Sequence, residues 1–183
     1  MRLFSHTNMM VQLMGLVLLL ALQTTARAGQ ASTLVLTCSA FENGGTIPQR
    51  YTCSGHNESP ALKWTGVPRE ARSLVLIVDD PDAPMGTFVH WVIYNLSATA
   101  AGLPQAMLAT ASVGGSEQGV NGRGEIGYTG PCPPPGKPHH YHFRLYALDS
   151  KLALKEGATA RQVEEAIKGH VIGSAELIGI FGR

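Results

Sequence analysis

Hydrophobic positions along the chain gather in short runs that glycine, proline, asparagine and serine separate. Six runs are rich in β-branched and aromatic residues, as β-strands are: STLVLTCSAF, ALKWTGV, SLVLIVDD, FVHWVIYNL, HYHFRLYALD and AELIGIFGR. Short strands bounded by turns are typical of an all-β sandwich. The runs SLVLIV and FVHWVIY are apolar at nearly every position, which predicts two central strands that are covered on both faces.

Helical periodicity occurs near the C-terminus. The spacing predicts a helix that begins at Ala160 and ends near Gly169. Thr159 and Gln162 have the spacing of a capping box, in which each side chain satisfies a backbone N–H of the other residue. A second helix around residues 154–158 would lack this periodicity. We therefore expect a mainly-β domain with one or two short helices.

The N-terminal residues have the pattern of a secretory signal peptide. Arg2 precedes a long apolar run, and the polar segment QTTARA that follows ends in an A-x-A cleavage pattern. An uncleaved membrane anchor is the alternative, but the apolar run is shorter than the ~20 residues that a spanning helix needs. We predict a signal peptide over residues 1–28, a single domain over residues 29–183, and a periplasmic or secreted location without an integral membrane segment after cleavage.

Composition limits the classes of partner. The formal net charge of +1 and the charged fraction of 15% indicate neither a nucleic-acid-binding patch nor an acidic tail. Small molecules or single anionic groups are better candidates. The glycine- and proline-rich segment from Gly114 to Gly136 lacks the Gly-Lys-Ser/Thr of a phosphate-binding loop. Tyr128, Cys132 and the stiff PPP run instead predict an ordered loop that packs on the body of the domain.

Three cysteines in an exported chain allow at most one intramolecular disulfide. Cys53 and Cys132 lie in the turn-rich segments YTCSG and GPCPPPG, whereas Cys38 ends a strand-like run, as a small buried apolar residue does. We prefer the pair Cys53–Cys132, although connectivity cannot be deduced from one sequence. The chain has no C-x-x-C spacing, and we expect neither a metal nor a cofactor.

Polar residues end several of the apolar rows. Because side chains alternate across a strand, Asp80 continues the row of Leu74, Leu76 and Val78. A concave polar site results if such rows meet at one end of a sandwich. The alternative is a purely structural role, in which DPDAP forms only a turn, since aspartate and proline favour turns.

The same rule places His90 in a row with Phe88, Val92 and Tyr94. Taken alone, a histidine with apolar neighbours is more often a hydrogen-bonded core residue than a ligand contact.

In the later run, His139 and Tyr141 lie on the core side, and His140 and His142 lie on the other side. An i, i+2 pair of histidines on an outer face is weak evidence for a metal site.

Five segments in order, SPALKWTGVP, DDPDAP, FVHWVIYNL, GYTGPCPPPG and HHYHFRLYALD, resemble the phosphatidylethanolamine-binding protein family, in particular its bacterial and archaeal Raf-kinase-inhibitor-like branch. The resemblance extends from about Thr33 to Phe181. It implies a Greek-key β-sandwich with a small anion-binding cavity at one end. The residues on the family's pocket positions are Asp80, Asp82, Phe88, His90, Gly130, Pro131, His139 and Tyr141.

A physical account of such a pocket follows from these residue types. We expect Asp80 to accept an N–H bond from His90 or His139, which would raise the imidazole pKa and present a positive donor to the anion. Tyr141 and a backbone N–H near Gly130 would add neutral donors.

We predict a secreted, non-enzymatic binding protein for a small phosphate or carboxylate group, which a lipid head group, a phosphorylated peptide or a protein could carry. The alternative is an inhibitor or signalling partner of another protein, such as a protease or a kinase, that acts through a surface such as the loop from Gly114 to Gly130. A hydrolase is less favoured, since no G-x-S-x-G motif occurs and neither Ser112 nor Ser116 has a motif context.

Overall fold

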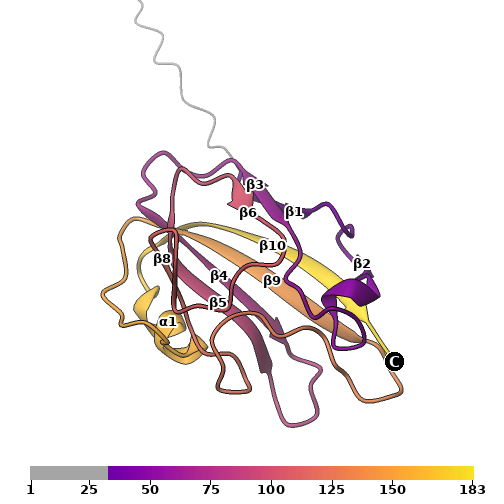
Figure 1. Cartoon of the computed structure of the whole chain (residues 1–183). Helices are drawn as coiled ribbons and strands as arrows, with labels where there is room; N and C mark the ends of the chain where they lie inside the picture. Colours follow the sequence, from indigo (N-terminus) through magenta and orange to yellow (C-terminus); the bar gives the residue numbers. More distant parts are fainter. Residues whose placement is uncertain (1–32) are drawn as a thin grey trace, which may run out of the picture. The chain divides into compact units, whose positions relative to one another are not determined.

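The computed structural model describes residues 33–183, which form two β-sheets (Figure 1). The signal peptide predicted over residues 1–28 lies outside the described residues, as do residues 29–32. The smaller sheet has the order β1–β3–β6, with β1 Val35–Cys38, β3 Leu62–Thr65 and β6 Gly102–Leu103.

The larger sheet has the order β2–β10–β9–β4–β5–β8–β7. Its strands are β2 Gly45–Thr46, β10 Val171–Phe181, β9 His139–Leu148, β4 Ser73–Asp80, β5 Phe88–Ser97, β8 Ser116–Gln118 and β7 Ser112–Val113. Neighbouring strands are antiparallel except β10 and β2. The predicted all-β sandwich is confirmed.

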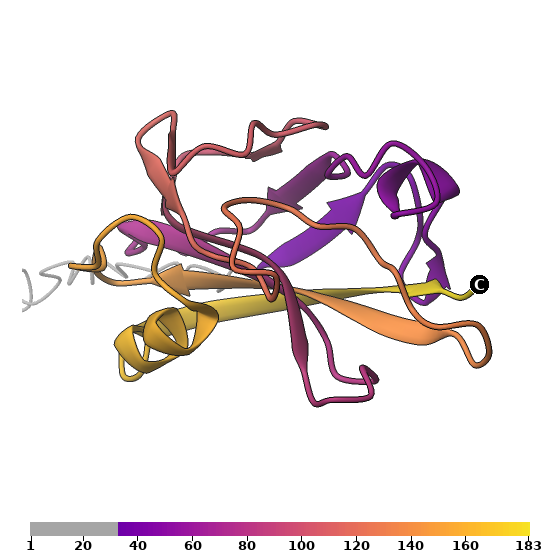
Figure 2. The same cartoon turned by 60° about the horizontal axis from the view of Figure 1, so that its bottom comes forward.

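The main core fills the space between the sheets. Leu74, Leu76 and Val78 of β4 face it, together with Leu36 of β1 and Trp64 of β3. A second cluster covers the opposite face of the larger sheet under α1 (Ala160–Ala166). Figure 2 shows the smaller sheet on one side of the larger one and α1 on the other. Because β4 has apolar neighbours on both faces, all eight of its residues are buried, as the apolar run predicts.

The structure confirms the six predicted strands and the helix. Thr159 and Gln162 form the expected capping box, and α1 ends at Ala166, before the predicted end. The strands β2, β6, β7 and β8 and the 3₁₀ turn η1 (Gln49–Tyr51) were not predicted. Each has two or three residues, too short a segment to show a hydrophobic period.

A disulfide joins Cys53 to Cys132, as the turn-rich setting of both cysteines predicts. It connects the segment after η1 to the loop before β9. In the described part of the chain, Cys38 is the free cysteine, and it is half-buried. No helix within residues 33–183 is long and apolar enough to cross a membrane.

Candidate functional site

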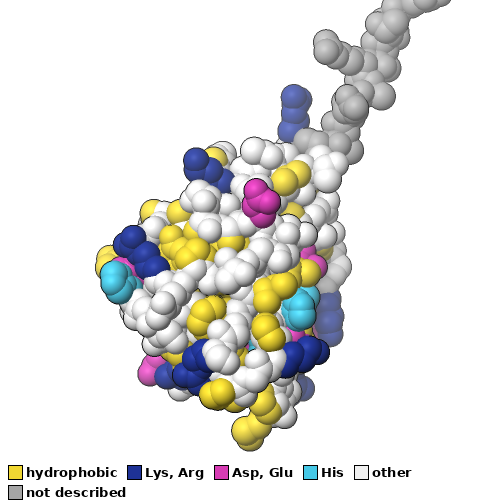
Figure 3. Space-filling model, turned by 90° about the vertical axis from the view of Figure 1, so that its right-hand side faces the viewer, with side chains coloured by type: hydrophobic (Ala, Val, Ile, Leu, Met, Phe, Trp, Pro, Cys, Tyr) yellow, Lys and Arg dark blue, Asp and Glu magenta, His cyan; other side chains and the backbone are white. Residues whose placement is uncertain are grey.

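A cavity of about 580 Å³ opens at the end of the larger sheet where β4 ends and β5 and β9 begin. The β4–β5 hairpin, the loop before β9, Arg123 in the turn after β8 and Arg183 beyond β10 also contribute to its wall. On the face seen in Figure 3, exposed hydrophobic and basic side chains gather at the lower end, where this hairpin lies in Figure 1. The lining residues are Asp80, Ala83, Pro84, Met85, Gly86, Phe88, His90, Arg123, Gly130, Cys132, Pro133, Pro134, His139 and Arg183.

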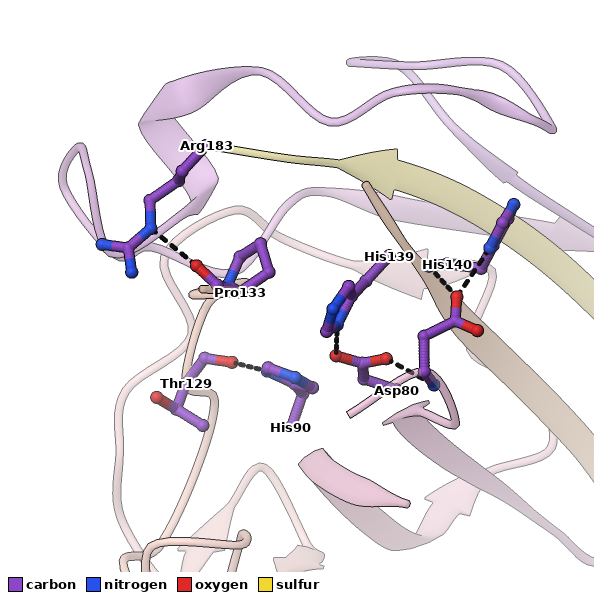
Figure 4. A network of polar contacts seen from close by, with 8 residues as sticks. Asp80, His90, Thr129, Pro133, His139, His140 and Arg183 are labelled. Carbon is purple, nitrogen blue, oxygen red and sulfur yellow. Dashed lines mark hydrogen bonds and ion pairs between the residues drawn. The ribbon is translucent and has the colours of Figure 1, made fainter. Parts of the chain in front are cut away.

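Asp80 and His139 form a buried pair in this wall. Their residues are 4% and 7% exposed, and His139 Nδ1 lies 2.7 Å from Asp80 Oδ2 (Figure 4). The backbone N–H of Asp82 donates to the other Asp80 oxygen at 2.9 Å. Because an ionised carboxylate only accepts hydrogen bonds, His139 carries its hydrogen on Nδ1. The Nε2 atom of His139 has no hydrogen-bond partner within residues 33–183.

A β-bulge brings His90 to the same face of the sheet. Val78 of β4 pairs with Trp91 of β5, but Asp79 pairs with Val89, so His90 is the extra residue. Trp91 belongs to the core between the sheets. The bulge allows His90 and Trp91 to face the same side, although they are consecutive.

Ring contacts confirm the side on which His90 lies. Its ring centroid is 4.9 Å from that of Phe88 and 5.1 Å from that of Tyr141. The simple alternation that grouped His90 with Val92 and Tyr94 is therefore wrong for these two residues, because both pack in the cluster under α1 on the opposite face. A one-residue irregularity reverses the face of every residue beyond it.

The imidazole of His90 is held by the loop, and Asp80 does not contact it. His90 Nδ1 donates to the carbonyl oxygen of Thr129 at 2.6 Å (Figure 4). Burial lowers the pKa of His90, and this effect exceeds the raising effects of the Thr129 hydrogen bond and the Asp80 charge. Of the two partners expected for Asp80, the structure selects His139. The alternative in which Asp80 bonds His90 and raises its pKa is therefore wrong.

Three of the residues carried over from the family pattern do not line the cavity. Asp82 instead accepts hydrogen bonds from the ring Nδ1 and backbone N–H of His140, at 2.7 and 2.9 Å, and the ring hydrogen bond lowers the pKa of Asp82 most. Pro131 is buried, and its carbonyl oxygen accepts from the N–H of Cys53 at 3.0 Å. Tyr141 is 1% exposed and lies behind His90.

The hydroxyl of Tyr141 is a buried polar atom without a hydrogen-bond partner in the described chain. Burial raises its pKa, so the hydroxyl stays protonated and keeps its hydrogen available as a donor. An orphaned buried hydroxyl is unusual enough to require a reason.

Gly130 lines the cavity, but its N–H is not available to a ligand. It donates to Asn57 Oδ1 at 2.7 Å, so the donor expected near Gly130 is not the N–H of Gly130 itself. The glycine serves close packing instead, because a Cβ at this position would lie 2.4 Å from the carbonyl oxygen of Tyr51.

The family model that is described as phosphatidylethanolamine-binding protein matches residues 37–182. This chain belongs to that family. The match includes every cavity-lining residue except Arg183.

Relatives place the chain in the bacterial and archaeal branch of the family. It is 52% identical over 145 residues to a UPF0098 protein of Methanothermobacter thermautotrophicus, with 79% of this chain and 95% of the relative covered. A UPF0098 protein of Chlamydia trachomatis is 47% identical over 153 residues, which cover 81% and 98% of the two chains.

Solved structures of the family have the same fold. A phosphatidylethanolamine-binding protein homologue from Chlamydia trachomatis matches with a TM-score of 0.77 and 44% identity, over 83% of this chain and 99% of the other. YbcL of E. coli, described as a member of the mammalian family, matches with the same TM-score at 31% identity and the same coverage.

Arg123 and Arg183 line the cavity but were missed from the sequence. Arg183 follows the last strand, and Arg123 lies in a turn of the glycine-rich segment after β8. Neither residue is part of the five segments that carry the family resemblance, and no periodic pattern marks a turn residue as facing a site. Residues 33–183 contain no cluster of three or more His, Cys, Asp or Glu side chains suited to a metal ion.

Proposed function

We propose that this member of the family is a secreted, non-enzymatic binding protein whose cavity holds a small anionic group, a phosphate or a carboxylate, at His90 and His139. The observation that supports the proposal is the state of the two imidazoles. Both rings line the cavity and both use Nδ1 as a donor to a protein oxygen, and neither Nε2 has a hydrogen-bond partner among residues 33–183. Two fixed rings with open Nε2 atoms form a preorganised polar site.

Anion binding at these rings is coupled to proton uptake. An imidazole whose Nδ1 carries a hydrogen offers a lone pair at Nε2 when neutral, and it offers a second N–H when protonated. An anion therefore binds the protonated form. Since burial lowers the pKa of His90 in the free protein, the anion must raise that pKa as it binds.

Asp80 acts as the positioning group for His139. Its two oxygens are occupied by the His139 ring and the Asp82 N–H, at 2.7 and 2.9 Å. The carboxylate is thus turned to the protein and does not need to contact the anion. Its negative charge also stabilises a protonated neighbouring imidazole.

The lining residues favour binding without catalysis. Within the described chain, the cavity wall contains no serine or threonine, and its cysteine, Cys132, is in the disulfide. A hydrolase of phosphate esters needs an activated nucleophile or a metal-bound water. Incubation of the protein with O-phosphoethanolamine, followed by ³¹P NMR, tests this part of the proposal. Unchanged ester is expected, and release of free phosphate above the buffer rate contradicts it.

Export is supported by the signal-peptide pattern over residues 1–28 and by the disulfide, since disulfides persist in oxidising compartments. N-terminal sequencing of the protein from periplasmic or secreted fractions should give a chain that begins at Gly29. A chain that starts at Met1 would contradict the proposed processing.

Binding itself is tested by an amide NMR titration of the purified protein with phosphate, O-phosphoethanolamine and acetate. Saturable shifts are expected around Asp80, His90 and His139. Shifts confined to residues away from the cavity, or none at millimolar ligand, would contradict the proposal.

A further inference from the structure

The cavity is larger than a single anion at the two imidazoles requires. Asp80, His90 and His139, here termed the floor, are buried, with exposed fractions of 4%, 4% and 7%. The cavity volume of about 580 Å³ is many times the ~30 Å³ that one water molecule occupies in the liquid. One phosphate or carboxylate at the floor therefore leaves most of the volume for the rest of a ligand.

Arg123 and Arg183, here termed the rim, are the exposed cationic residues of the same wall. The turn that carries Arg123 is fixed, because the backbone N–H of Arg123 donates to Asn121 Oδ1 at 2.9 Å. Gly122 packs so closely on Phe88 that a Cβ there would lie 2.6 Å from the ring. The charge of Arg123 is close enough to His90 to lower the pKa of that histidine, although less than burial does.

Arg183 follows β10, whereas Arg123 follows β8. In the larger sheet, β9, β4 and β5 lie between these two strands. The Nε of Arg183 donates to the carbonyl oxygen of Pro133 at 2.7 Å (Figure 4). This bond holds the guanidinium beside the loop and leaves its terminal nitrogens without a hydrogen-bond partner in residues 33–183. A guanidinium oriented in this way is suited to the two oxygens of a carboxylate or phosphate.

Neither rim arginine forms an ion pair within residues 33–183. By contrast, Arg50 pairs with Glu58 at 3.0 Å, and Arg144 pairs with Asp79 and Glu176. The acidic residue of the cavity wall, Asp80, is already occupied by His139. Two arginine side chains without an ion pair in the described part of the chain thus border a cavity whose deeper groups are suited to a first anion.

We infer that the natural ligand carries two separate anionic groups, one held at the floor and a second, a carboxylate or a phosphate, held by Arg123 and Arg183. The inference rests on the proposed function and specifies its ligand class. The cavity lining also includes the apolar residues Phe88, Met85 and Pro133, which are suited to contact the part of the ligand that joins the two groups.

Matched ligands that differ by one carboxylate test this inference. The probes are O-phosphoserine against O-phosphoethanolamine, and 3-phosphoglycerate against glycerol 3-phosphate, with affinities from isothermal titration of the purified protein. The carboxylate member should bind roughly two- to fivefold more tightly in at least one pair, the range expected of a solvent-accessible charge pair. This preference should shrink at high salt, because exposed charges are screened.

Substitutions at the rim test whether Arg123 and Arg183 cause the tighter binding of the carboxylate-bearing ligand. Arg123→Gln and Arg183→Gln together should abolish it while the ester without the carboxylate still binds. Arg161→Gln, an exposed arginine of α1 that does not line the cavity, is the matched control and should retain it.

The outcomes separate the two claims. Equal affinity within both pairs, or a preference that survives the double substitution, overturns the inference and leaves the anion site at the floor intact. Absence of binding by all four probes overturns the proposed function as well.

Discussion

Asp79 and Asp80 are consecutive residues at the end of β4, both 4% exposed, but they lie on opposite faces of the larger sheet. On the outer face, Arg144 Nη1 pairs with Asp79, and Arg144 Nε bonds Glu176 Oε1 at 3.0 Å. Glu176 also accepts from His142 Nδ1 at 2.9 Å. These charges compensate one another, so the cluster resembles a structural ion network.

On the inner face, Asp80 pairs with His139 in the wall of the cavity. The imidazole keeps an open Nε2, and a second imidazole with an open Nε2 lies in the same wall. The same residue chemistry therefore has two roles. Asp79 Oδ1 is also buried without a hydrogen-bond partner in residues 33–183, so an unused polar atom alone does not mark a site. What distinguishes the candidate site from the stabilising network is that its pair lines a cavity.

The sharpest test of this contrast is the pair of substitutions Asp80→Ala and Asp79→Ala. Asp80→Ala should lower phosphate affinity by more than roughly tenfold, because His139 loses the hydrogen bond that fixes its ring orientation and its Nδ1 hydrogen. Asp79→Ala should leave affinity within about twofold and lower the free energy of unfolding by about 1–3 kcal/mol, because it separates a partly buried ion pair. Calorimetric titration and urea unfolding measure the two effects.

Equal losses of affinity in the two variants would contradict the contrast between the faces. The Asp80→Ala result counts only if urea unfolding shows that the variant is folded.

The next effect in size concerns neighbouring histidines of β9. His139→Ala should lower phosphate affinity by roughly tenfold, since it removes one of the two open Nε2 atoms. His140→Ala should change it by about twofold or less, because His140 is on the outer side and pairs with Asp82. The reverse ranking, measured by the same titration, would mean that the assignment of faces along β9 is wrong.

Removal of the disulfide should have a smaller effect on phosphate affinity, and it tests how the wall of the cavity is held in place. Replacing Cys53 and Cys132 together by serine should lower the free energy of unfolding by about 2–4 kcal/mol, given the long chain segment that the disulfide closes. Phosphate affinity should fall by roughly threefold, because the loop that supplies Gly130 and Pro133 becomes less preorganised. Cys38→Ser is the control and should change affinity little. Unaltered affinity in the double variant would show that hydrogen bonds alone hold this wall.

The smallest effect is the dependence of affinity on pH. Sulfate is a suitable probe because its own charge is constant between acidic and neutral pH. Its affinity should rise by roughly twofold per unit as pH falls, because the anion needs protonated imidazoles and the pKa of His90 is lowered in the free protein. His90→Asn should flatten the profile. An affinity that falls as pH decreases would contradict the proposed role of the imidazoles.

The lowered pKa of His90 also affects the stability of the free protein. Affinity for the anion rises as pH falls, but stability decreases. The unfolded chain binds a proton at His90 near the ordinary value of 6.5, and the folded chain does so only at lower pH. Unfolding therefore takes up a proton in this window, and the contribution of His90 to stability decreases as pH falls below 6.5. Saturating sulfate should offset part of that loss.

The sequence was sufficient for the elements that have a clear period. The buried row that ends in Asp80 and the alternation that separates His139 from His140 follow from strand geometry, and both agree with the pairing of β4 with β9. The capping box at Thr159 also has a strictly local cause. These features depend on residues that are neighbours along the chain.

Features that depend on contacts distant in sequence were not accessible. The bulge at His90 depends on how β5 pairs with β4, and no residue in FVHWVIYNL marks it. The use of the Gly130 N–H depends on Asn57, which is 73 residues away. Arg123 and Arg183 come from a turn and from the end of the last strand, and only the folded chain brings them to one cavity.

The most direct test of the account is ¹⁵N NMR of the histidine side chains in the purified protein, with and without saturating phosphate. We predict that Nδ1 of His90 and His139 carries hydrogen in both states, that Nε2 of His90 changes from a lone pair to an N–H when phosphate binds, and that the Nε2 signal of His139 shifts as the ring contacts the anion. Nε2 signals that remain unchanged at saturation, or that change only at His140 and His142 on the outer side of β9, would contradict the claim that the two inner imidazoles form an anion site.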